Sequence, residues 1–213
     1  MRIVCISDTH SRHDLVEVPP GDILIHAGDS TMIGRMEEVI RFNHWLGELS
    51  HPYKILIAGN HDWLFEKEPA LAEGLITNAM YLRDSSVTID GIRFYGSPWQ
   101  PRFMHWAFNL SRGAEIRRKW DLIPEDTDVL ITHGPPHGIL DLVPRDLTGT
   151  YEHTGCEELS RALERISPKL HVFGHIHEGY GVEHRGGTTF VNACACDASY
   201  RAVNPPVTVV DVI

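Results

Sequence analysis

Short apolar runs, each followed within two residues by histidine, aspartate or asparagine, recur along most of this chain. They are too short for helices and rich in β-branched residues, so buried strands are predicted at 2–7, 22–27, 53–58, 128–132 and 169–173. The motifs that follow these runs are Asp8-Thr9-His10, Gly28-Asp29, Gly59-Asn60-His61-Asp62, Thr132-His133-Gly134 and Gly174-His175-Ile176-His177. Open α/β sheets place their sites at strand ends, so these motifs are expected to meet there.

Helices and further strands are predicted between these runs from the spacing of apolar side chains. The spacing is helical at 36–49, 68–76, 113–120 and 157–166. Short β-prone runs are found at 81–82, 86–89, 92–95, 180–183, 188–192 and 206–212, whereas 138–154 is predicted to be a loop. Alternating strands and helices followed by hairpin-like strands favour a mixed α/β sandwich over a purely parallel sheet, in one domain spanning residues 1–213.

The charge balance and the cysteines limit the classes of function. The 213 residues carry a net charge of −10 and show no basic run, which argues against a general binder of extended nucleic acid. The chain contains no apolar run of about 18 residues, so no membrane partner is expected. Its four cysteines lack C-x-x-C spacing, which argues against a structural zinc knuckle, and the reducing cytoplasm is the predicted location.

Seven side chains at the predicted strand ends form a candidate metal-binding set: Asp8, His10, Asp29, Asn60, His133, His175 and His177. Two carboxylates, one amide oxygen and four imidazoles are too many for one tetrahedral ion and suit two ions that share a ligand. In an extended segment, His175 and His177 would point to the same side. The set lacks thiolates and mixes nitrogen with oxygen, which fits Mn²⁺, Fe, Co or Zn²⁺. Two divalent ions against two carboxylates leave about +2 of charge, which suits a phosphate substrate in an acidic protein.

The order of the five motifs resembles that of the calcineurin-like metallophosphoesterases. Three segments further resemble the small metallophosphoesterase-domain-containing (MPPED) branch of that superfamily: Ser97-Pro98-Trp99, Thr132-His133-Gly134-Pro135-Pro136 and residues 168–174. The resemblance implies a four-layer αββα sandwich of two mixed β-sheets flanked by helices. It also implies two divalent metal ions, with Mn²⁺ as the first candidate, and a hydroxide that bridges them and attacks phosphorus in line.

The resemblance also assigns roles to individual residues. One ion would be held by Asp8, His10, Asp29 and His177, and the other by Asn60, His133, His175 and the shared Asp29. His61 is expected to stabilise the phosphoryl oxygens or to protonate the leaving group, a role worth about 10²–10⁴ in rate. Asp62 is expected to orient His61.

Substrate contacts are predicted for residues near the motifs and in two loops: Asn60, His61, Trp99, Arg102, His137 and His153. The aromatic loop 97–109 has two interpretations. Either it caps the site, with a ring stacked on a nucleobase, or its rings fill the core between the sheets.

One departure from the protein Ser/Thr phosphatases bears on the substrate. Those enzymes carry Gly-Asp-x-x-Asp-Arg-Gly where this chain has Gly28-Asp29-Ser30-Thr31-Met32-Ile33-Gly34. Met32 therefore replaces the second acid, and Ile33 replaces an arginine that would pair the extra charge of a phosphomonoester. Small phosphodiesters, cyclic nucleotides among them, are the predicted substrates. The alternatives are a nucleotide- or partner-binding module with little turnover, and a phosphomonoesterase or protein phosphatase.

Overall fold

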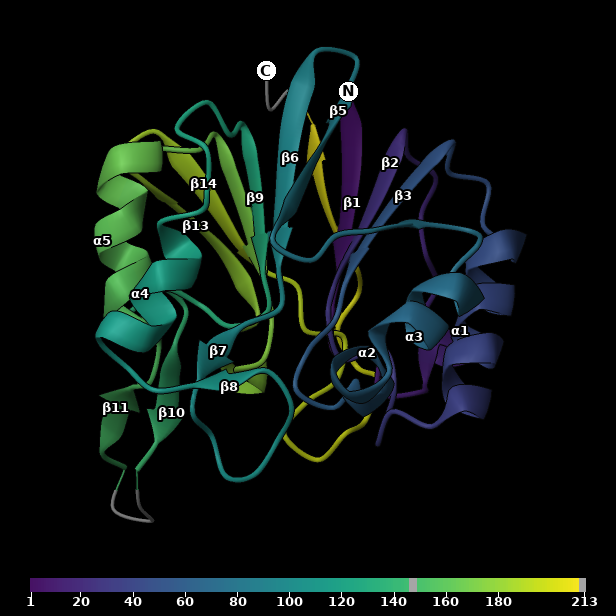
Figure 1. The fold of residues 1–213 in the computed structure, drawn as a ribbon, viewed down its shortest axis with the longest axis horizontal. Helices are drawn as coiled ribbons and strands as arrows, with labels where there is room; N and C mark the ends of the chain where they lie inside the picture. The colour runs from purple at the N-terminus through teal and green to yellow at the C-terminus, as the bar shows by residue number, and fades with distance from the viewer. Residues whose placement is uncertain (146–148, 211–213) are drawn as a thin grey trace.

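The computed structural model describes residues 1–145 and 149–210, and two β-sheets form its centre (Figure 1). The first sheet has the strand order β15-β1-β2-β3-β4. Strands β1 to β4 pair in parallel, and β15 pairs antiparallel to β1. Their bounds are Arg2–Ile6 (β1), Ile23–Ala27 (β2), Tyr53–Ile57 (β3), Met80–Tyr81 (β4) and Val207–Val210 (β15).

The second sheet has the strand order β13-β14-β12-β9-β6-β5. Its four central strands are parallel to one another, and the two edge strands, β13 and β5, are antiparallel to their neighbours. The bounds are Ser85–Ile89 (β5), Ile92–Ser97 (β6), Val129–Thr132 (β9), Leu170–Phe173 (β12), Gly181–Arg185 (β13) and Thr188–Asn192 (β14). Both sheets are therefore mixed, as predicted.

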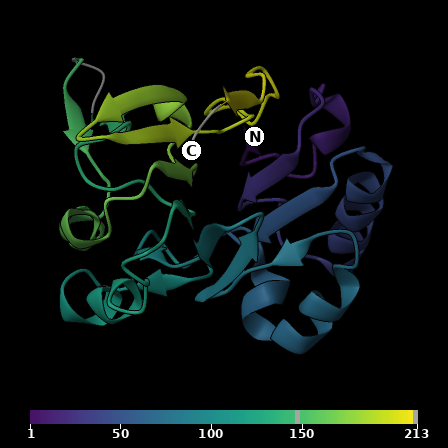
Figure 2. The ribbon, with the colours of Figure 1, turned by 90° about the horizontal axis from the view of Figure 1, so that it is seen from above.

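Helices cover the outer faces of the two sheets (Figure 2). Phe42 and Phe65 pack from the helices of one side against Leu24 of the first sheet, and Trp120 packs from the other side against Leu130 of the second. The helices on the first sheet are Met36–Glu48 (α1), Trp63–Lys67 (α2) and Pro69–Leu75 (α3), and those on the second are Ala114–Trp120 (α4) and Glu157–Ile166 (α5). The four-layer αββα sandwich is confirmed.

The parallel strands are covered on both faces, which explains why they are continuous apolar runs. In β1, Ile3 and Cys5 belong to the cluster between the two sheets, whereas Val4 and Ile6 belong to the cluster under the helices. Successive side chains of a strand point to opposite faces, so a strand buried on both sides is apolar at most positions; His26 in β2 and His171 in β12 are buried polar exceptions.

Two predictions of irregular structure are wrong in part. Within 138–154, the strands Leu142–Pro144 (β10) and Tyr151–His153 (β11) form an antiparallel pair. Their side chains are mostly exposed, so the sequence shows no apolar alternation there. In the aromatic loop, Gln100–Pro101 (β7) pairs with Asn109–Leu110 (β8).

Two 3₁₀ turns complete the helical elements that the described residues form: His13–Leu15 (η1) and His177–Gly179 (η2). None of the helices in the described ranges is long and apolar enough to cross a membrane.

Candidate metal centre

The predicted motifs follow strands whose carboxyl ends lie at the same end of the sandwich (Figure 1). The two sheets are joined at this end by hydrogen bonds of Ser7, which follows β1. Its N–H donates to the carbonyl of Ala193 at 2.8 Å, and its carbonyl accepts from the N–H of Ala195 at 2.8 Å. Motifs from both sheets are thereby brought to a single site, and all seven predicted ligands lie there.

Four of the predicted ligands have a left-handed backbone. The φ angles are 52° at Asp8, 43° at His10, 55° at Asp29 and 67° at His175. Residues with a Cβ rarely adopt this conformation, and the strain that it costs is concentrated at functional sites. The prediction that residues 175–177 are extended is therefore wrong. The strand ends at Phe173, and η2 begins at His177.

Two glycines leave room for these side chains. A Cβ on Gly59 would overlap the Asp29 carboxylate and the His133 ring. A Cβ on Gly174 would overlap the Asp8 carboxylate. The glycine in each of these motifs is therefore needed for the close approach of a neighbouring ligand, as a side chain would displace it.

The first group of donor atoms surrounds His177. Its Nδ1–H donates to the carbonyl of Asp197 at 2.8 Å, so in the neutral ring Nε2 carries a lone pair. That Nε2 lies 3.2 Å from Nε2 of His10 and 3.4 Å from Oδ1 of Asp8. Oδ2 of Asp29 is 3.8 Å from the same His10 nitrogen. These four side chains are the set predicted for one ion.

The second group surrounds His133. Its Nδ1–H donates to the carbonyl of Ala27 at 3.0 Å, so Nε2 again carries a lone pair. This Nε2 faces Oδ1 of Asn60 at 2.9 Å and Oδ2 of Asp29 at 3.4 Å. The His175 ring lies with its centroid 5.1 Å from that of His133. When both rings are neutral, the Nε2 lone pairs of His133 and His177 thus face oxygen acceptors, an arrangement that a cation satisfies.

The pKa values show that this site attracts positive charge. Burial by itself raises the pKa of Asp8, but the hydrogen bond to His177 and the nearby imidazoles outweigh it and hold the pKa well below its usual range. Burial lowers the pKa of His177 and of His133, but the carboxylates of Asp8 and Asp29 outweigh it and raise both pKa values to about 9. The carboxylates therefore need either protons or metal ions beside them, and divalent ions fit the nitrogen and oxygen donors present.

A family model described as calcineurin-like phosphoesterase matches residues 1–179. The chain belongs to this family. It is 50% identical over 232 residues to "Metallophosphoesterase domain-containing protein 1" of Homo sapiens, a match that covers 98% of this chain and 70% of the human protein. It is 42% identical to a UPF0046 protein of Caenorhabditis elegans, covering 97% of this chain and 59% of that protein. The resemblance drawn from the motifs is confirmed.

The fold is also found among solved structures. A crystal structure from Thermus thermophilus matches with a TM-score of 0.60 at 16% identity, covering 90% of this chain and 88% of that chain. At this level of identity the match shows the fold alone. Phosphoesterases of this family depend on two metal ions, and the described residues contain groups able to hold them.

His61 lies beside the donor atoms of this phosphoesterase. One of its ring nitrogens is within 4.8 Å of donor atoms of His10 and Asp29. Its Nδ1–H donates to the backbone carbonyl of Met32 at 2.6 Å. Its ring is stacked on Trp106, with ring centroids 4.1 Å apart and planes 23° apart. The backbone N–H of His61 also donates to Oδ1 of Asp29 at 2.8 Å, which leaves Oδ2 directed toward His10 and His133.

The prediction that Asp62 orients His61 is wrong. The Asp62 carboxylate is fully buried and accepts hydrogen bonds from the backbone and side chains of Ser30 and Thr31 and from the N–H of Gly59. Asp62 directly precedes α2, and its side chain turns back toward the loop that follows β2. It therefore holds two ligand loops together and does not contact the imidazole.

The aromatic loop 97–109 contributes both to the core and to the site. Trp99 donates its indole N–H to Asp84 at 2.8 Å and packs on Phe108, so the predicted substrate contact of Trp99 is wrong. Trp106 stacks on His61, and Phe103 meets the His175 ring edge-on at a centroid distance of 5.7 Å. The sequence pattern does not show which of these rings enter the core and which reach the site, because the loop between β7 and β8 is irregular and has no regular alternation of apolar residues.

A cavity of about 490 Å³ adjoins the candidate metal centre, and His175 lines it. Arg102, a predicted substrate contact, lines one side with Phe103, and Glu152 lies on the hairpin β10–β11 that lines another. The predicted contacts of His137 and His153 are not supported. His153 pairs with Asp141 at 2.6 Å, and His137 lines a different cavity beside α5.

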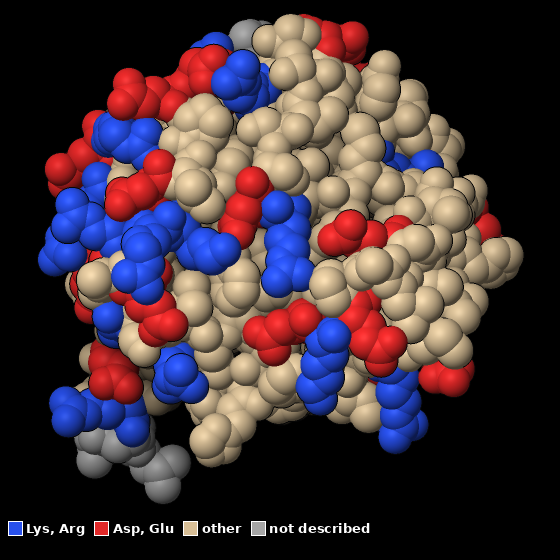
Figure 3. Space-filling view, in the orientation of Figure 1, with Lys and Arg blue, Asp and Glu red and all other residues tan. Residues whose placement is uncertain are grey.

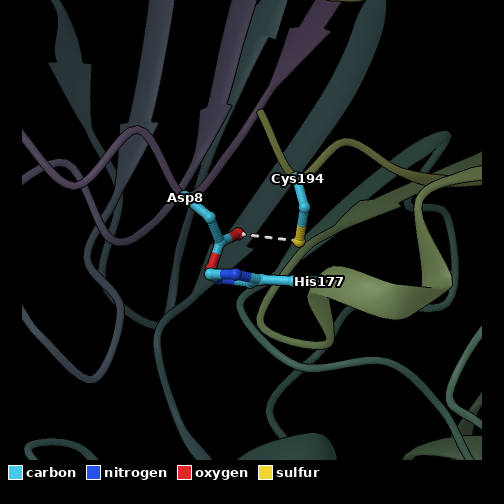
Figure 4. A group of neighbouring side chains, drawn as sticks. All are labelled: Asp8, His177 and Cys194. Atoms are coloured by element: carbon cyan, nitrogen blue, oxygen red, sulfur yellow. Dashed lines mark hydrogen bonds and ion pairs between the residues drawn. The ribbon is translucent and has the colours of Figure 1, made fainter. Parts of the chain in front are cut away.

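Cys194 is a site residue that the sequence analysis did not identify. Its Sγ lies 3.2 Å from Oδ2 of Asp8, next to His177 (Figure 4). The available signal was its position: Cys194 follows the predicted strand 188–192 at the same end of the sheet as the ligand motifs. Without a metal-binding spacing, however, a cysteine near a strand end is indistinguishable from a packing residue.

Proposed function

We propose that this phosphoesterase is a dinuclear metal-dependent phosphodiesterase that hydrolyses small phosphodiesters, cyclic nucleotides among them. The observation that carries the proposal is the set of facing acceptor atoms. Nε2 of His133 lies 2.9 Å from Asn60 Oδ1, and Nε2 of His177 lies 3.4 Å from Asp8 Oδ1. Two cations placed among these atoms would replace repulsion by coordination.

The proposed ligands divide between the two ions at Asp29. Oδ2 of Asp29 lies 3.8 Å from Nε2 of His10 and 3.4 Å from Nε2 of His133, so one oxygen can serve both groups. Mn²⁺ is the proposed metal, because the donors are imidazoles, carboxylates and an amide with no thiolate directed at them. A pair of divalent ions supplies charge that polarises a phosphoryl group and lowers the pKa of an attacking water.

His61 is the proposed catalytic residue of the chain. The Met32 carbonyl fixes the proton on Nδ1, so Nε2 is the nitrogen that can hold or donate a second proton. Stacking on Trp106 restricts rotation of the ring. We propose that protonated His61 stabilises the phosphoryl oxygens and protonates the leaving oxygen.

The loop after β2 supports a diester substrate. Met32 presents its backbone to His61, and Ile33, whose side chain is 43% exposed, stands where the protein Ser/Thr phosphatases carry an arginine, so this position offers no guanidinium to a phosphomonoester dianion. A diester carries one charge less and needs no such partner. The cavity beside His175, with Arg102 and Phe103 on its wall, has room for the second ester group.

The distribution of charge supports a small substrate over extended nucleic acid. On the face shown in Figure 3, basic side chains gather at the left, over α4 and α5, with acidic side chains beside them, and they do not extend as a basic surface across the rest of the face. Extended nucleic acid requires an array of phosphate contacts from lysine and arginine. We also propose a reducing, cytoplasmic location, because the four cysteines, Cys5, Cys156, Cys194 and Cys196, are free thiols.

The test compares hydrolysis of bis(p-nitrophenyl) phosphate and p-nitrophenyl phosphate by metal-stripped protein before and after addition of Mn²⁺. We expect Mn²⁺-dependent hydrolysis that is faster on the diester. His61→Ala should lower its kcat by about 10²–10⁴-fold while the Mn²⁺ content stays unchanged. Faster hydrolysis of the monoester would favour the phosphomonoesterase alternative. Nucleotide binding at full metal occupancy without turnover would favour a binding module.

A further inference from the structure

The two oxygens of the Asp8 carboxylate have different surroundings (Figure 4). Oδ2 accepts a hydrogen bond from the Ser7 hydroxyl at 2.5 Å and lies 3.2 Å from Sγ of Cys194. Oδ1 lies 3.4 Å from Nε2 of His177 and 3.8 Å from Nε2 of His10. Oδ2 is therefore contacted by two side chains with hydrogen-bond donors, whereas Oδ1 faces the proposed metal ligands.

Cys194 is fixed in place by the connection between the two sheets. It lies in the segment after β14 whose neighbours, Ala193 and Ala195, pair with Ser7. Its N–H donates to the Asn192 side chain at 3.2 Å, and its carbonyl accepts from the Asn204 side chain at 3.0 Å. Cys194 is completely buried, so its thiol has little freedom to turn away from Asp8.

The contact between Cys194 and Asp8 requires a proton. A thiolate sulfur beside a carboxylate oxygen would place two negative groups against each other, whereas a thiol S–H can donate to that oxygen. The Ser7 hydroxyl is 3.2 Å from the carbonyl of Gly28 but 2.5 Å from Asp8, so its single proton is directed at Asp8. The backbone N–H of His175 is shared between both oxygens of this carboxylate, at 3.0 Å from Oδ2 and 3.1 Å from Oδ1, so it does not distinguish them.

We infer that Cys194, together with Ser7, is a positioning residue of the metal centre. The two donors hold Oδ2 of Asp8 and thereby direct Oδ1 toward His10 and His177. The inference rests on the proposed metal centre, but not on the substrate. Side chains that orient metal ligands in this way change metal affinity by about 10–100-fold when they are removed.

Direct coordination of a metal by Cys194 is the competing interpretation. Donor atoms of Asp8, His177 and Cys194 all lie within 4.8 Å of one another. The sulfur contacts Oδ2, however, and not Oδ1, the carboxylate oxygen that faces His177. The geometry therefore favours a thiol that holds the ligand over a thiolate that replaces it.

The experiment measures Mn²⁺ affinity by titration calorimetry on metal-stripped protein. Cys194→Ala should weaken the tighter of the two binding events, or the single event observed, by about 10–100-fold. Cys194→Ser restores a donor and should recover most of the affinity. The matched control is Cys196→Ala, because Cys196 is also buried in this segment but its sulfur is 3.8 Å from the carbonyl of Thr9. Wild-type affinity in Cys194→Ala would show that the thiol only fills space.

A cobalt titration separates the two interpretations. Wild-type protein loaded with Co²⁺ should show no sulfur-to-cobalt charge-transfer band. If such a band appears and Cys194→Ala removes it, Cys194 is a metal ligand and the positioning role is overturned. If Cys194→Ala fails to fold, Ser7→Ala removes the other side-chain donor to Oδ2 and should weaken Mn²⁺ binding to a similar degree. A wild-type chain that binds neither Mn²⁺ nor Co²⁺ would overturn the metal centre itself, and the positioning role with it. Absence of hydrolysis with intact metal binding would overturn only the proposed activity.

Discussion

The backbone carbonyl of Met32 accepts a hydrogen bond from Nδ1–H of His61 at 2.6 Å. In the phosphatases that the second motif resembles, an acidic side chain at the position of Met32 would support this histidine. In this chain the backbone carbonyl of Met32 makes this contact in place of a side chain. A carbonyl can only accept, so the tautomer of His61 is set by the backbone and does not depend on the side chain at position 32.

This relationship predicts that Met32→Ala is nearly silent. The carbonyl remains, so kcat for a phosphodiester with Mn²⁺ should stay within about threefold of wild type, since a contact that is kept contributes no change in barrier. His61→Ala in parallel should lose about 10²–10⁴-fold. A large loss in Met32→Ala with unchanged metal content would show that the side chain, and not the carbonyl, supports catalysis.

The stacking of Trp106 on His61 predicts that kcat depends on whether an aromatic ring is kept at position 106. Trp106→Leu should lower kcat by about 3–10-fold, because an aromatic pair contributes about 0.5–1.5 kcal/mol beyond its buried area. Trp106→Phe keeps a ring and should recover most of the rate. Trp99→Leu is the control, since Trp99 packs on Phe108 away from His61 and should lower the melting temperature with little effect on kcat per folded molecule. Equal kcat in Trp106→Leu and wild type would exclude a role for the stack.

The division of ligands predicts different metal stoichiometries in three variants. His175→Gly and His177→Ala should each reduce the bound ions from two to about one, because each removes a ligand of one group only. Asp29→Ala should impair both ions, as Oδ2 of Asp29 lies beside His10 and His133 alike. Metal analysis of protein dialysed against Mn²⁺ checks all three. Retention of one tightly bound ion in Asp29→Ala would show that this carboxylate is not shared.

The surroundings of Asp62 predict a loss of stability in its variants. Asp62→Ala leaves the donors of Ser30, Thr31 and Gly59 buried without their acceptor, so we expect the free energy of unfolding to fall by about 3–5 kcal/mol. Urea unfolding of metal-stripped protein measures this. Asp14→Ala changes an exposed carboxylate and should alter stability by less than about 0.5 kcal/mol. A catalytic defect in Asp62→Ala without a stability defect would instead support the orienting role.

Buried His171 predicts a loss of stability in mild acid. Burial lowers its pKa from 6.5 to about 3. The folded protein keeps the ring neutral while the unfolded chain takes up a proton, so this contribution is complete above pH 6.5 and is lost as the pH falls toward about 3. Between pH 6.5 and pH 5 the loss is about 2 kcal/mol, at about 1.4 kcal/mol per pH unit.

His171→Leu should remove this share of the acid sensitivity, because leucine has no group to protonate where His171 lies against Phe173 and Phe190, with Nε2 hydrogen-bonded to the Thr132 hydroxyl at 2.8 Å. Urea unfolding at the two pH values should show a smaller decrease in His171→Leu than in wild type. His44→Gln changes an exposed histidine and should keep the wild-type decrease. Identical decreases in wild type and His171→Leu would mean that His171 is already protonated in the folded state or that its burial is not maintained.

The strands, the main helices and the seven candidate ligands were predictable because they depend on local pattern. Each buried strand is a largely apolar run, and each ligand motif follows such a run directly. Parallel strands end at the same edge of a sheet, so ligands far apart in the chain were expected to meet. The hairpin β10–β11 was missed because its side chains are exposed and leave no apolar alternation.

By itself, the sequence determined the order of the strands along the chain, the ligand types at their ends and the family to which the chain belongs. Only the tertiary structure decided the contacts of those ligands. Met32 and not Asp62 meets the His61 ring, Trp106 and not Trp99 reaches the site, and Cys194 contacts Asp8 across 186 positions of the chain. Such contacts depend on how two sheets and a loop pack against one another. The sequence pattern around a residue does not identify a partner that only tertiary packing brings close to it.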